Sequence, residues 1–243
     1  MLKRAFTGLA AVGLLATLSS PALAEGITKD QGDVIINELR QIRLLLSRQA
    51  QPAQAKPEAP ERVKVKLGKE HSLGNSNAPI VMLEYTDYQC PFCNRFFTGT
   101  FPELKKQYID TGKMRFITRD FPLDFHPYSM KAAEAAQCAG EQGKFWPMKD
   151  ALMTNSAKLN AELISTLADG IGVDMGKFKG CMDSNKFIPV IKDEVEAARG
   201  INIGGTPSFV IGKVSGDYLE GYLVVGAQPF ENFDAVARKV LSE

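Results

Sequence analysis

Two cysteines held two residues apart constrain the fold of this chain more than any other feature. They are Cys90 and Cys93, in the segment DYQCPFCN. The preceding run PIVMLEY, residues 79–85, predicts a short buried β-strand, and the residues after the pair show helical spacing of apolar side chains up to Gly112. The segment KMRFITRDFPL predicts a second strand. Strand, helix and strand in this order indicate a parallel βαβ unit, with the cysteine pair at the start of its helix.

The start of a helix is a chemically distinctive place for a cysteine. The backbone N–H groups of the first turn have no partner within the helix, and the helix dipole is positive there. Pro91 suits this turn, where its missing N–H leaves no hydrogen bond unmade. Because such a site favours thiolate over thiol, we expect Cys90 to be the nucleophile in disulfide exchange. Cys93, one turn further along and shielded, is expected to resolve the mixed disulfide.

Zinc is the main chemical alternative, because a Cys-x2-Cys pair is also half of a tetrahedral thiolate site. The other two cysteines, Cys138 and Cys181, stand apart from each other, and His71 and His126 have no ligand-like spacing to any cysteine. A purely structural bond within the close pair is also disfavoured, since so small a ring constrains the unfolded chain little. We therefore expect a redox pair and no metal.

The first 24 residues have the features of a secretory signal peptide. Lys3 and Arg4 precede an apolar stretch from about Leu9 to Leu18, and Ala22-Leu23-Ala24 is a small-x-small cleavage site. A retained membrane anchor is the alternative, but the apolar run is shorter than the roughly 20 residues that a bilayer crossing needs. Export places all four cysteines in an oxidising compartment, where two disulfides with three possible connectivities can form.

Residues 25–50 predict an amphipathic helix, and residues 51–62 a Pro/Ala-rich linker. The apolar residues that recur with a four-three-four spacing are Ile35, Leu39, Ile42 and Leu46. Fewer than three heptads make a marginal helix in water, so this stripe must be buried, either against copies of itself or on the chain's own domain. The linker favours self-association, and we expect a homo-oligomer.

Residues 63–243 are expected to form the main domain. The stretch from about 126 to 200 is helical throughout and predicts an inserted helical subdomain. SFVIG and YLEGYLVVG predict a β-hairpin, and PFENFDAVARKVLSE a closing helix. The formal net charge of +1 becomes −1 once Lys3 and Arg4 are removed. Such a balance implies neither a nucleic acid nor another strongly charged partner.

Three segments, VMLEYTDYQCPFC, FITRDFPLDFHP and GGTPSFVIG, resemble the DsbA family of bacterial periplasmic thiol-disulfide oxidoreductases, part of the thioredoxin-like superfamily. The similarity runs from about Pro79 to the C-terminus. It implies an α/β thioredoxin-like fold with an inserted helical subdomain, a periplasmic location and no bound cofactor. It also implies cysteine-containing substrate proteins and a membrane or periplasmic redox partner.

The resemblance also implies roles for particular residues. Glu84, six residues before Cys90, matches a buried acid that helps proton transfer to and from the cysteines. Pro207 is implied to have a cis peptide bond and to lie beside the active-site sulfurs, where the backbone around Thr206 pairs with a bound substrate. Pro91 and Phe92, between the two cysteines, are expected to contact the substrate.

Cys138 and Cys181 are expected to form a structural disulfide that joins two helices, as some relatives carry. The alternative is two unpaired buried thiols, which pack as small apolar groups.

Two departures from the family bear on the direction of electron flow. The best-known oxidases carry a histidine where this chain has Phe92, so a weaker oxidant is expected. Thr206 before Pro207 resembles the oligomeric disulfide isomerases more than the monomeric oxidases. The leading hypothesis is an exported oxidoreductase that forms or isomerises disulfides in proteins. The alternative is a non-catalytic periplasmic chaperone or binding protein on the same fold.

Overall fold

The computed structural model describes residues 28–50 and 61–243. The chain forms two units, which divide between Lys56 and Pro57. The expected signal peptide, residues 1–24, and most of the expected linker lie outside the described residues. The first unit contains helix α1, Lys29–Ala50, at the place where the apolar stripe predicts a helix.

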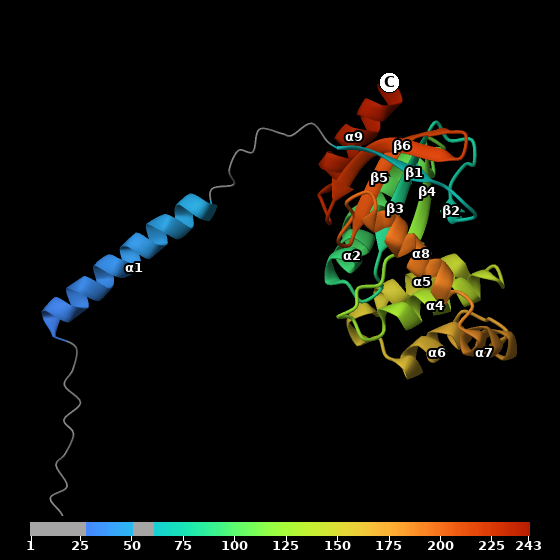
Figure 1. Ribbon diagram of the computed structural model, residues 1–243, viewed down its shortest axis with the longest axis horizontal. Helices are drawn as coiled ribbons and strands as arrows, with labels where there is room; N and C mark the ends of the chain where they lie inside the picture. Colours follow the sequence, from blue (N-terminus) through green and yellow to red (C-terminus); the bar gives the residue numbers. More distant parts are fainter. Residues whose placement is uncertain (1–27, 51–60) are drawn as a thin grey trace, which may run out of the picture. The chain divides into compact units, whose positions relative to one another are not determined.

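The second unit is built on one six-stranded sheet (Figure 1). The strands in chain order are β1 Arg62–Lys66, β2 His71–Leu73, β3 Ile80–Thr86, β4 Met114–Asp120, β5 Ser208–Ser215 and β6 Tyr218–Val225. Their order across the sheet is β1-β6-β5-β3-β4-β2, with β3 and β4 parallel and the other pairs antiparallel. The parallel βαβ unit and the β5–β6 hairpin are as the sequence predicts.

Two strands have no counterpart in the sequence prediction. β1 and β2 are the two edge strands, and they are only five and three residues long. The three residues of β2 are too few to show an alternation, whereas RVKVK in β1 alternates polar and apolar residues, with its two valines buried, and is a strand signal that the sequence prediction missed. The first strand of the second unit, β1, begins at Arg62.

The helical stretch after β3 runs without a break from Pro91 to Ile109 and changes type along its length. Its segments are α2 Pro91–Arg95, the π-helical Phe96–Thr100, α3 Phe101–Leu104 and the π-helical Lys105–Ile109. A kink is expected near Gly99 and Pro102, and the structure has these wider turns on either side of Pro102.

The helical subdomain is inserted between β4 and β5 and lies beyond one end of the strands (Figure 1). Its helices are α4 Ser129–Gly140, α5 Phe145–Thr154, the 3-10 turn Ser156–Lys158, α6 Ala161–Gly170, α7 Met175–Ser184 and α8 Ile188–Arg199. After the hairpin, α9 Phe230–Ser242 closes the domain. In the described parts of the chain, no helix is both long enough and apolar enough to cross a membrane.

Buried apolar side chains form three clusters, one on each face of the sheet and one in the helical subdomain. One face of the sheet packs on the helices through aromatic side chains, with ring centroids 4.4 Å apart for Phe96 and Phe209 and 4.9 Å apart for Phe209 and Phe233. The other face packs against α8. The third cluster is the core of the helical subdomain, and Cys90 and Cys93 belong to it. The insertion therefore forms part of the surroundings of the cysteine pair.

Candidate active site

The fold places the close cysteine pair at the end of a buried strand and the beginning of a helix. All seven residues of β3 are buried. Cys90 is the N-cap residue of α2, with extended backbone angles (φ −72°, ψ 120°), and Pro91 is the first helical residue. Cys93 lies one turn along, with none of its surface exposed, whereas Cys90 keeps 3% and Phe92 keeps 52%. Both cysteines are thiols in this structure.

The two sulfurs have opposite acid–base properties. A hydrogen bond from the Cys93 thiol is the largest cause that lowers the pKa of Cys90 to about 5; burial opposes it, and the Thr206 side chain and first-turn backbone N–H groups support it. Burial, followed by the interaction with Cys90, raises the pKa of Cys93 well above its ordinary value. The pair therefore carries a thiolate on Cys90 and a neutral thiol on Cys93 near neutral pH.

A distant loop completes the surroundings of the sulfurs. The peptide bond between Thr206 and Pro207 is cis. The Cys90 sulfur lies 3.4 Å from the carbonyl oxygen of Thr206, across 116 positions of the sequence. The structure thus brings Cys90, Cys93, Thr206 and Pro207 together. Pro91 and Phe92 face outward on the same turn.

Glu84 lies on β3 with none of its surface exposed, and it is paired with a residue that sequence reasoning missed. Its Oε2 is 2.8 Å from the ammonium of Lys149 and accepts a hydrogen bond from the Thr118 hydroxyl at 3.1 Å. Lys149 belongs to α5 of the insertion, is fully buried, and also contacts Thr118 Oγ1 at 3.1 Å. The other carboxylate oxygen, Oε1, has no hydrogen-bond partner among the described residues.

Tyr88 connects this ion pair to the cysteine loop. Its ring lies in the cluster that contains both cysteines, and the Lys149 ammonium is 5.5 Å from the ring centroid. Burial and the nearby Asp120 and Glu84 carboxylates raise the pKa of the Tyr88 hydroxyl well above its ordinary value. Tyr88 therefore stays neutral and adds no charge beside the acid–lysine pair.

Two further acids meet at the end of β4: Asp120, which is buried, and Glu194, which is half-buried. Burial raises the pKa of Asp120 to about 6 and that of Glu194, on α8, to about 8. The Asp120 backbone N–H donates to Glu194 Oε2 at 3.1 Å, and the Gln137 side-chain amide donates to Asp120 Oδ2 at 2.7 Å. Sequence reasoning did not identify these two acids, because the contact between them joins β4 to the helical insertion across 74 positions of the sequence.

Asp87 organises the loop that leads to the cysteines, and sequence reasoning missed it too. Its backbone N–H lies 3.5 Å from the Cys93 sulfur. Its carboxylate accepts hydrogen bonds from the backbone N–H groups of Gln89 at 2.7 Å and Leu123 at 2.8 Å. His126 Nδ1 is 2.8 Å from the same carboxylate. One buried side chain therefore holds the loop after β4 against the loop before α2.

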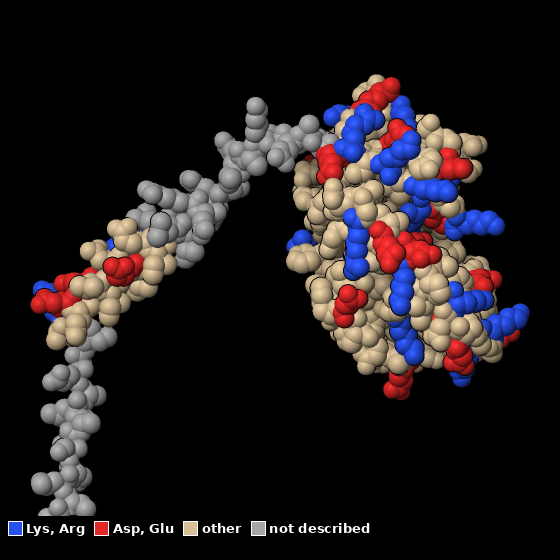
Figure 2. Space-filling model, in the orientation of Figure 1, with Lys and Arg blue, Asp and Glu red and all other residues tan. Residues whose placement is uncertain are grey.

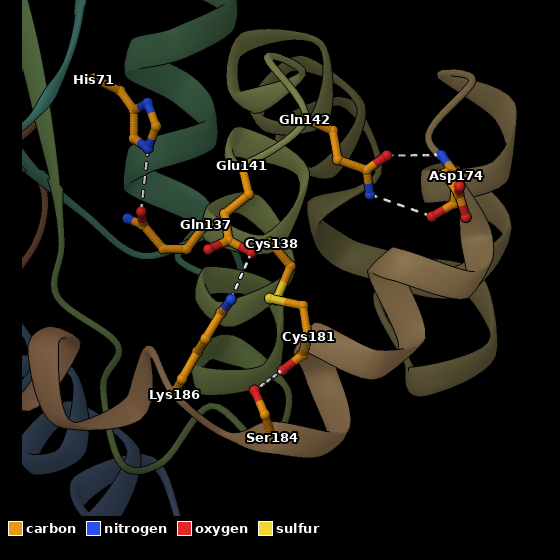
Figure 3. The surroundings of a disulfide bond; sticks show 9 residues. All are labelled: His71, Gln137, Cys138, Glu141, Gln142, Asp174, Cys181, Ser184 and Lys186. Carbon is orange, nitrogen blue, oxygen red and sulfur yellow. Dashed lines mark hydrogen bonds and ion pairs between the residues drawn. A yellow bond between two sulfur atoms is a disulfide. The ribbon is translucent and has the colours of Figure 1, made fainter.

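The second cysteine pair lies in the helical subdomain (Figure 3). Cys138 on α4 and Cys181 on α7 form a disulfide and are separated by 43 positions in the sequence. An exposed ion pair between Glu141 and Lys186, 2.7 Å long, lies beside this bond. The disulfide joins two helices of the insertion and is not part of the Cys90 site. Within residues 28–50 and 61–243, no His, Cys, Asp and Glu side chains gather in a set of three that could hold a metal ion.

Comparison with known proteins agrees with this architecture. A family model described as thioredoxin matches residues 66–219. The chain belongs to the thioredoxin family. Among solved structures, α-DsbA1 from Wolbachia pipientis superimposes with a TM-score of 0.66 at 28% identity, over 73% of this chain and 94% of that chain. A thioredoxin-like oxidoreductase from Silicibacter pomeroyi gives 0.61 at 26% identity, over 72% and 93% of the two chains. The predicted resemblance and fold class are confirmed.

Curated relatives with sequence similarity are much longer proteins. The Na(+)/H(+) antiporter NhaA 3 of Salinispora tropica is 32% identical over 150 residues, which is 61% of this chain but 22% of the antiporter. The chain thus spans about a fifth of the length of the curated relatives that it matches. The transport activity in the antiporter's name is not carried over to this chain.

Proposed function

We propose that this chain is an exported thiol-disulfide oxidoreductase that forms or isomerises disulfide bonds in cysteine-containing substrate proteins. The observation that carries the proposal is the pairing of Cys90, with its pKa lowered to about 5 at the start of α2, with the shielded thiol of Cys93. A nucleophile and a resolving thiol are the two groups that disulfide exchange needs. The Cys90–Cys93 disulfide itself accepts the two electrons and the reduced pair holds them, so no bound cofactor takes part.

Oxidation of a substrate proceeds by two exchanges. A substrate thiolate attacks the Cys90 sulfur of the Cys90–Cys93 disulfide, a bond forms between substrate and Cys90, and Cys93 leaves. Cys93 then takes up a proton, since its pKa is raised by burial. A second substrate thiolate attacks the substrate sulfur of the mixed disulfide and releases Cys90 as thiolate. The substrate loses two electrons, which remain on the reduced pair until a membrane or periplasmic redox partner removes them.

Isomerisation uses the same groups without net electron transfer. The Cys90 thiolate attacks an incorrect substrate disulfide and forms a mixed disulfide. The substrate thiolate released in that step, or another, attacks a different substrate sulfur and finally displaces Cys90. A thiolate that is stable near neutral pH makes Cys90 both available for attack and a good leaving group.

The stabilised thiolate also bears on the direction of electron flow. Whatever stabilises the Cys90 thiolate stabilises the reduced pair, which makes the disulfide a better oxidant. The histidine that Phe92 replaces is one source of such stabilisation, but in this chain the Cys93 thiol and backbone N–H groups supply it. This supports oxidation or isomerisation over reduction.

Proton movement is assigned to the buried groups behind the sulfurs. Glu84 keeps one carboxylate oxygen without a partner among the described residues, so that oxygen is available to accept a proton. Lys149 holds the other oxygen and fixes the orientation of the carboxylate. Lys149 is therefore a positioning residue, and Glu84 is the proton carrier of the proposal.

Substrate binding is assigned to the outer side of the same site. Phe92 offers an exposed aromatic surface next to Cys90, with Pro91 beside it, and the backbone around Thr206 and Pro207 borders the Cys90 sulfur. An extended polypeptide pairing with this backbone would bring its own cysteine to Cys90. The signal-like segment at residues 1–24 supports a periplasmic location for this chemistry.

The reduction potential of the Cys90–Cys93 pair tests the proposal. The mature protein is equilibrated in graded glutathione buffers, and the four cysteines are followed separately by alkylation and peptide mass mapping. A potential on the order of −120 to −180 mV is expected for a protein that donates or shuffles disulfides. A value near roughly −270 mV or below would identify a reductase. A pair that never exchanges would favour the non-catalytic binding protein.

A further inference from the structure

The surface of α1 carries apolar side chains that the described structure leaves uncovered. The exposed fractions of Val34, Ile35, Ile36, Leu39 and Ile42 lie between 46% and 62%. Figure 2 shows the described part of this helix as mostly uncharged surface with a few charged side chains. Five large apolar side chains left in water along one short helix are unfavourable, so a partner is expected to cover them.

The spacing of this stripe is that of a heptad repeat. Ile35, Leu39 and Ile42 are separated by four and then three positions, and Leu46 follows four positions later in the sequence. In heptad notation this places Ile35 and Ile42 at position d, and Leu39 and Leu46 at position a. Leu at a with Ile at d favours bundles of three or four helices over dimers. Ile36, at position e, widens the stripe, as expected when each helix contacts two neighbours.

The charged residues beside the stripe identify the partner and its direction. Glu38 falls at position g and Arg43, five residues later, at position e. In a parallel bundle, a g residue of one helix faces the e residue five positions later on its neighbour, so opposite charges meet at every interface. An antiparallel arrangement would place g against g and e against e. Neither side chain has an ion-pair partner among the described residues.

We propose that α1 joins three or four copies of this chain in a parallel coiled coil, with Leu39 and Ile42 in its core and Glu38 of each copy paired with Arg43 of its neighbour. A helix of 22 residues is marginal in water when isolated, so association and the stability of α1 depend on each other. Each particle then carries one Cys90 site per copy. This inference rests on α1 alone and stands or falls independently of the proposed redox activity.

Charge reversal in the full mature chain tests orientation and register. The wild type, Glu38→Arg, Arg43→Glu and the double variant are compared by sedimentation velocity over a range of concentrations. The wild type should sediment with three or four times the mass of one chain. Each single reversal places like charges at every interface and should weaken association by about tenfold or more, since several pairs change together. The double variant should associate within about threefold of the wild type.

Mixing the two single variants tests the pairing of Glu38 with Arg43 more directly. In an equimolar mixture of the two single variants, the arginine introduced by Glu38→Arg would face the glutamate introduced by Arg43→Glu on a neighbouring helix. Hetero-oligomers should therefore form at concentrations where neither variant associates alone. A double variant that stays as weak as the single ones would overturn the parallel register. A wild type that is monomeric or dimeric at all concentrations would overturn the proposed assembly, with docking on the chain's own domain or on another protein as the remaining explanations.

A core variant separates association from folding. Leu39→Asp should give monomers, whereas Asn37→Asp, which adds the same charge at the outward position f, should leave the mass unchanged. Thermal unfolding of the thioredoxin-like domain should be the same in both variants, because the substitutions lie in the other unit. Leu39→Asp particles of unchanged mass would contradict the assigned core.

Discussion

The two cysteine pairs of this chain differ in bonding although they are buried to nearly the same extent. Cys90 and Cys93 expose 3% and 0% of their surface, and Cys138 and Cys181 expose 1% and 6%. The first pair is three residues apart and remains as thiols in this structure, while the second spans 43 positions and is a disulfide. Burial therefore does not distinguish the redox pair from the structural bond.

Position along a helix does distinguish them. Cys90 caps the beginning of α2, where backbone N–H groups and the positive end of the dipole favour a thiolate. Cys138 and Cys181 lie in the carboxyl-terminal halves of α4 and α7, where the dipole disfavours negative charge. Under the proposed function, the backbone around each sulfur, more than its exposure, is the difference between the pair that exchanges and the pair that stays bonded.

The largest expected effect is loss of the nucleophile. Cys90→Ser should lower the rate of disulfide exchange with a reduced or scrambled substrate protein by at least about 10³-fold, because the attacking sulfur is gone. Refolding of scrambled ribonuclease measures this rate. The matched control is Cys138→Ala/Cys181→Ala, which should retain exchange. Equal losses in both proteins would break the distinction between the pairs.

For the free energy of unfolding, in contrast to the exchange rate, the pair that should matter is Cys138 and Cys181. Removing the Cys138–Cys181 bond releases a loop of more than 40 residues and should lower the free energy of unfolding by about 4 kcal/mol in the chain-entropy model. Urea unfolding of Cys138→Ala/Cys181→Ala against the wild type, both with the Cys90 pair reduced, measures the difference. A loss below about 1 kcal/mol would show that packing of the insertion does not depend on the bond.

Lys149 links the two regions, since it comes from the insertion and pairs with Glu84 behind the redox site. Lys149→Met should lower the free energy of unfolding by about 3 kcal/mol, because it leaves a buried carboxylate without its counter-charge. Glu84→Leu/Lys149→Met should recover most of that loss, and Lys158→Met, at an exposed lysine, should change stability by less than about 0.5 kcal/mol. Equal urea midpoints for the two Lys→Met variants would show that the pairing of Lys149 with Glu84 does not affect the free energy of unfolding.

The smallest effect, taken per pH unit, is a pH dependence that only the Cys90–Cys93 pair should show. In the reduced protein the pKa of Cys90 is lowered from 9.0 to about 5, so its contribution to stability grows from pH 5 to pH 9 and is lost as pH falls through 5. The oxidised protein lacks this group. The reduced form should therefore gain stability over the oxidised form by about 1 kcal/mol per pH unit in this window, with the second disulfide intact. If the stability difference between the reduced and oxidised forms stays constant between pH 6 and pH 8, the lowered pKa of Cys90 would be contradicted.

Local patterns in the sequence were sufficient for the elements that carry the site. A buried strand followed by Cys-x2-Cys and helical periodicity predicts β3, α2 and the order of the two sulfurs, because each signal lies within a few consecutive residues. The helical insertion, the hairpin and the heptad stripe of α1 follow from the same kind of evidence. The edge strand β2 does not, since three residues show too little periodicity; β1 was missed although RVKVK alternates polar and apolar residues.

The contacts that give the site its chemistry depend on the tertiary structure. The Thr206 carbonyl lies beside Cys90 across 116 positions, and Lys149 reaches Glu84 across 65. A lysine in a predicted helix is expected at the surface, and nothing local shows that this one is buried on an acid. Nothing in the local sequence shows the pairing of Asp87 with His126 either. Local sequence was enough to single out the cysteine pair. Packing between distant segments set the charge and the neighbours of its sulfurs, because burial and the choice of partners are properties of the folded chain.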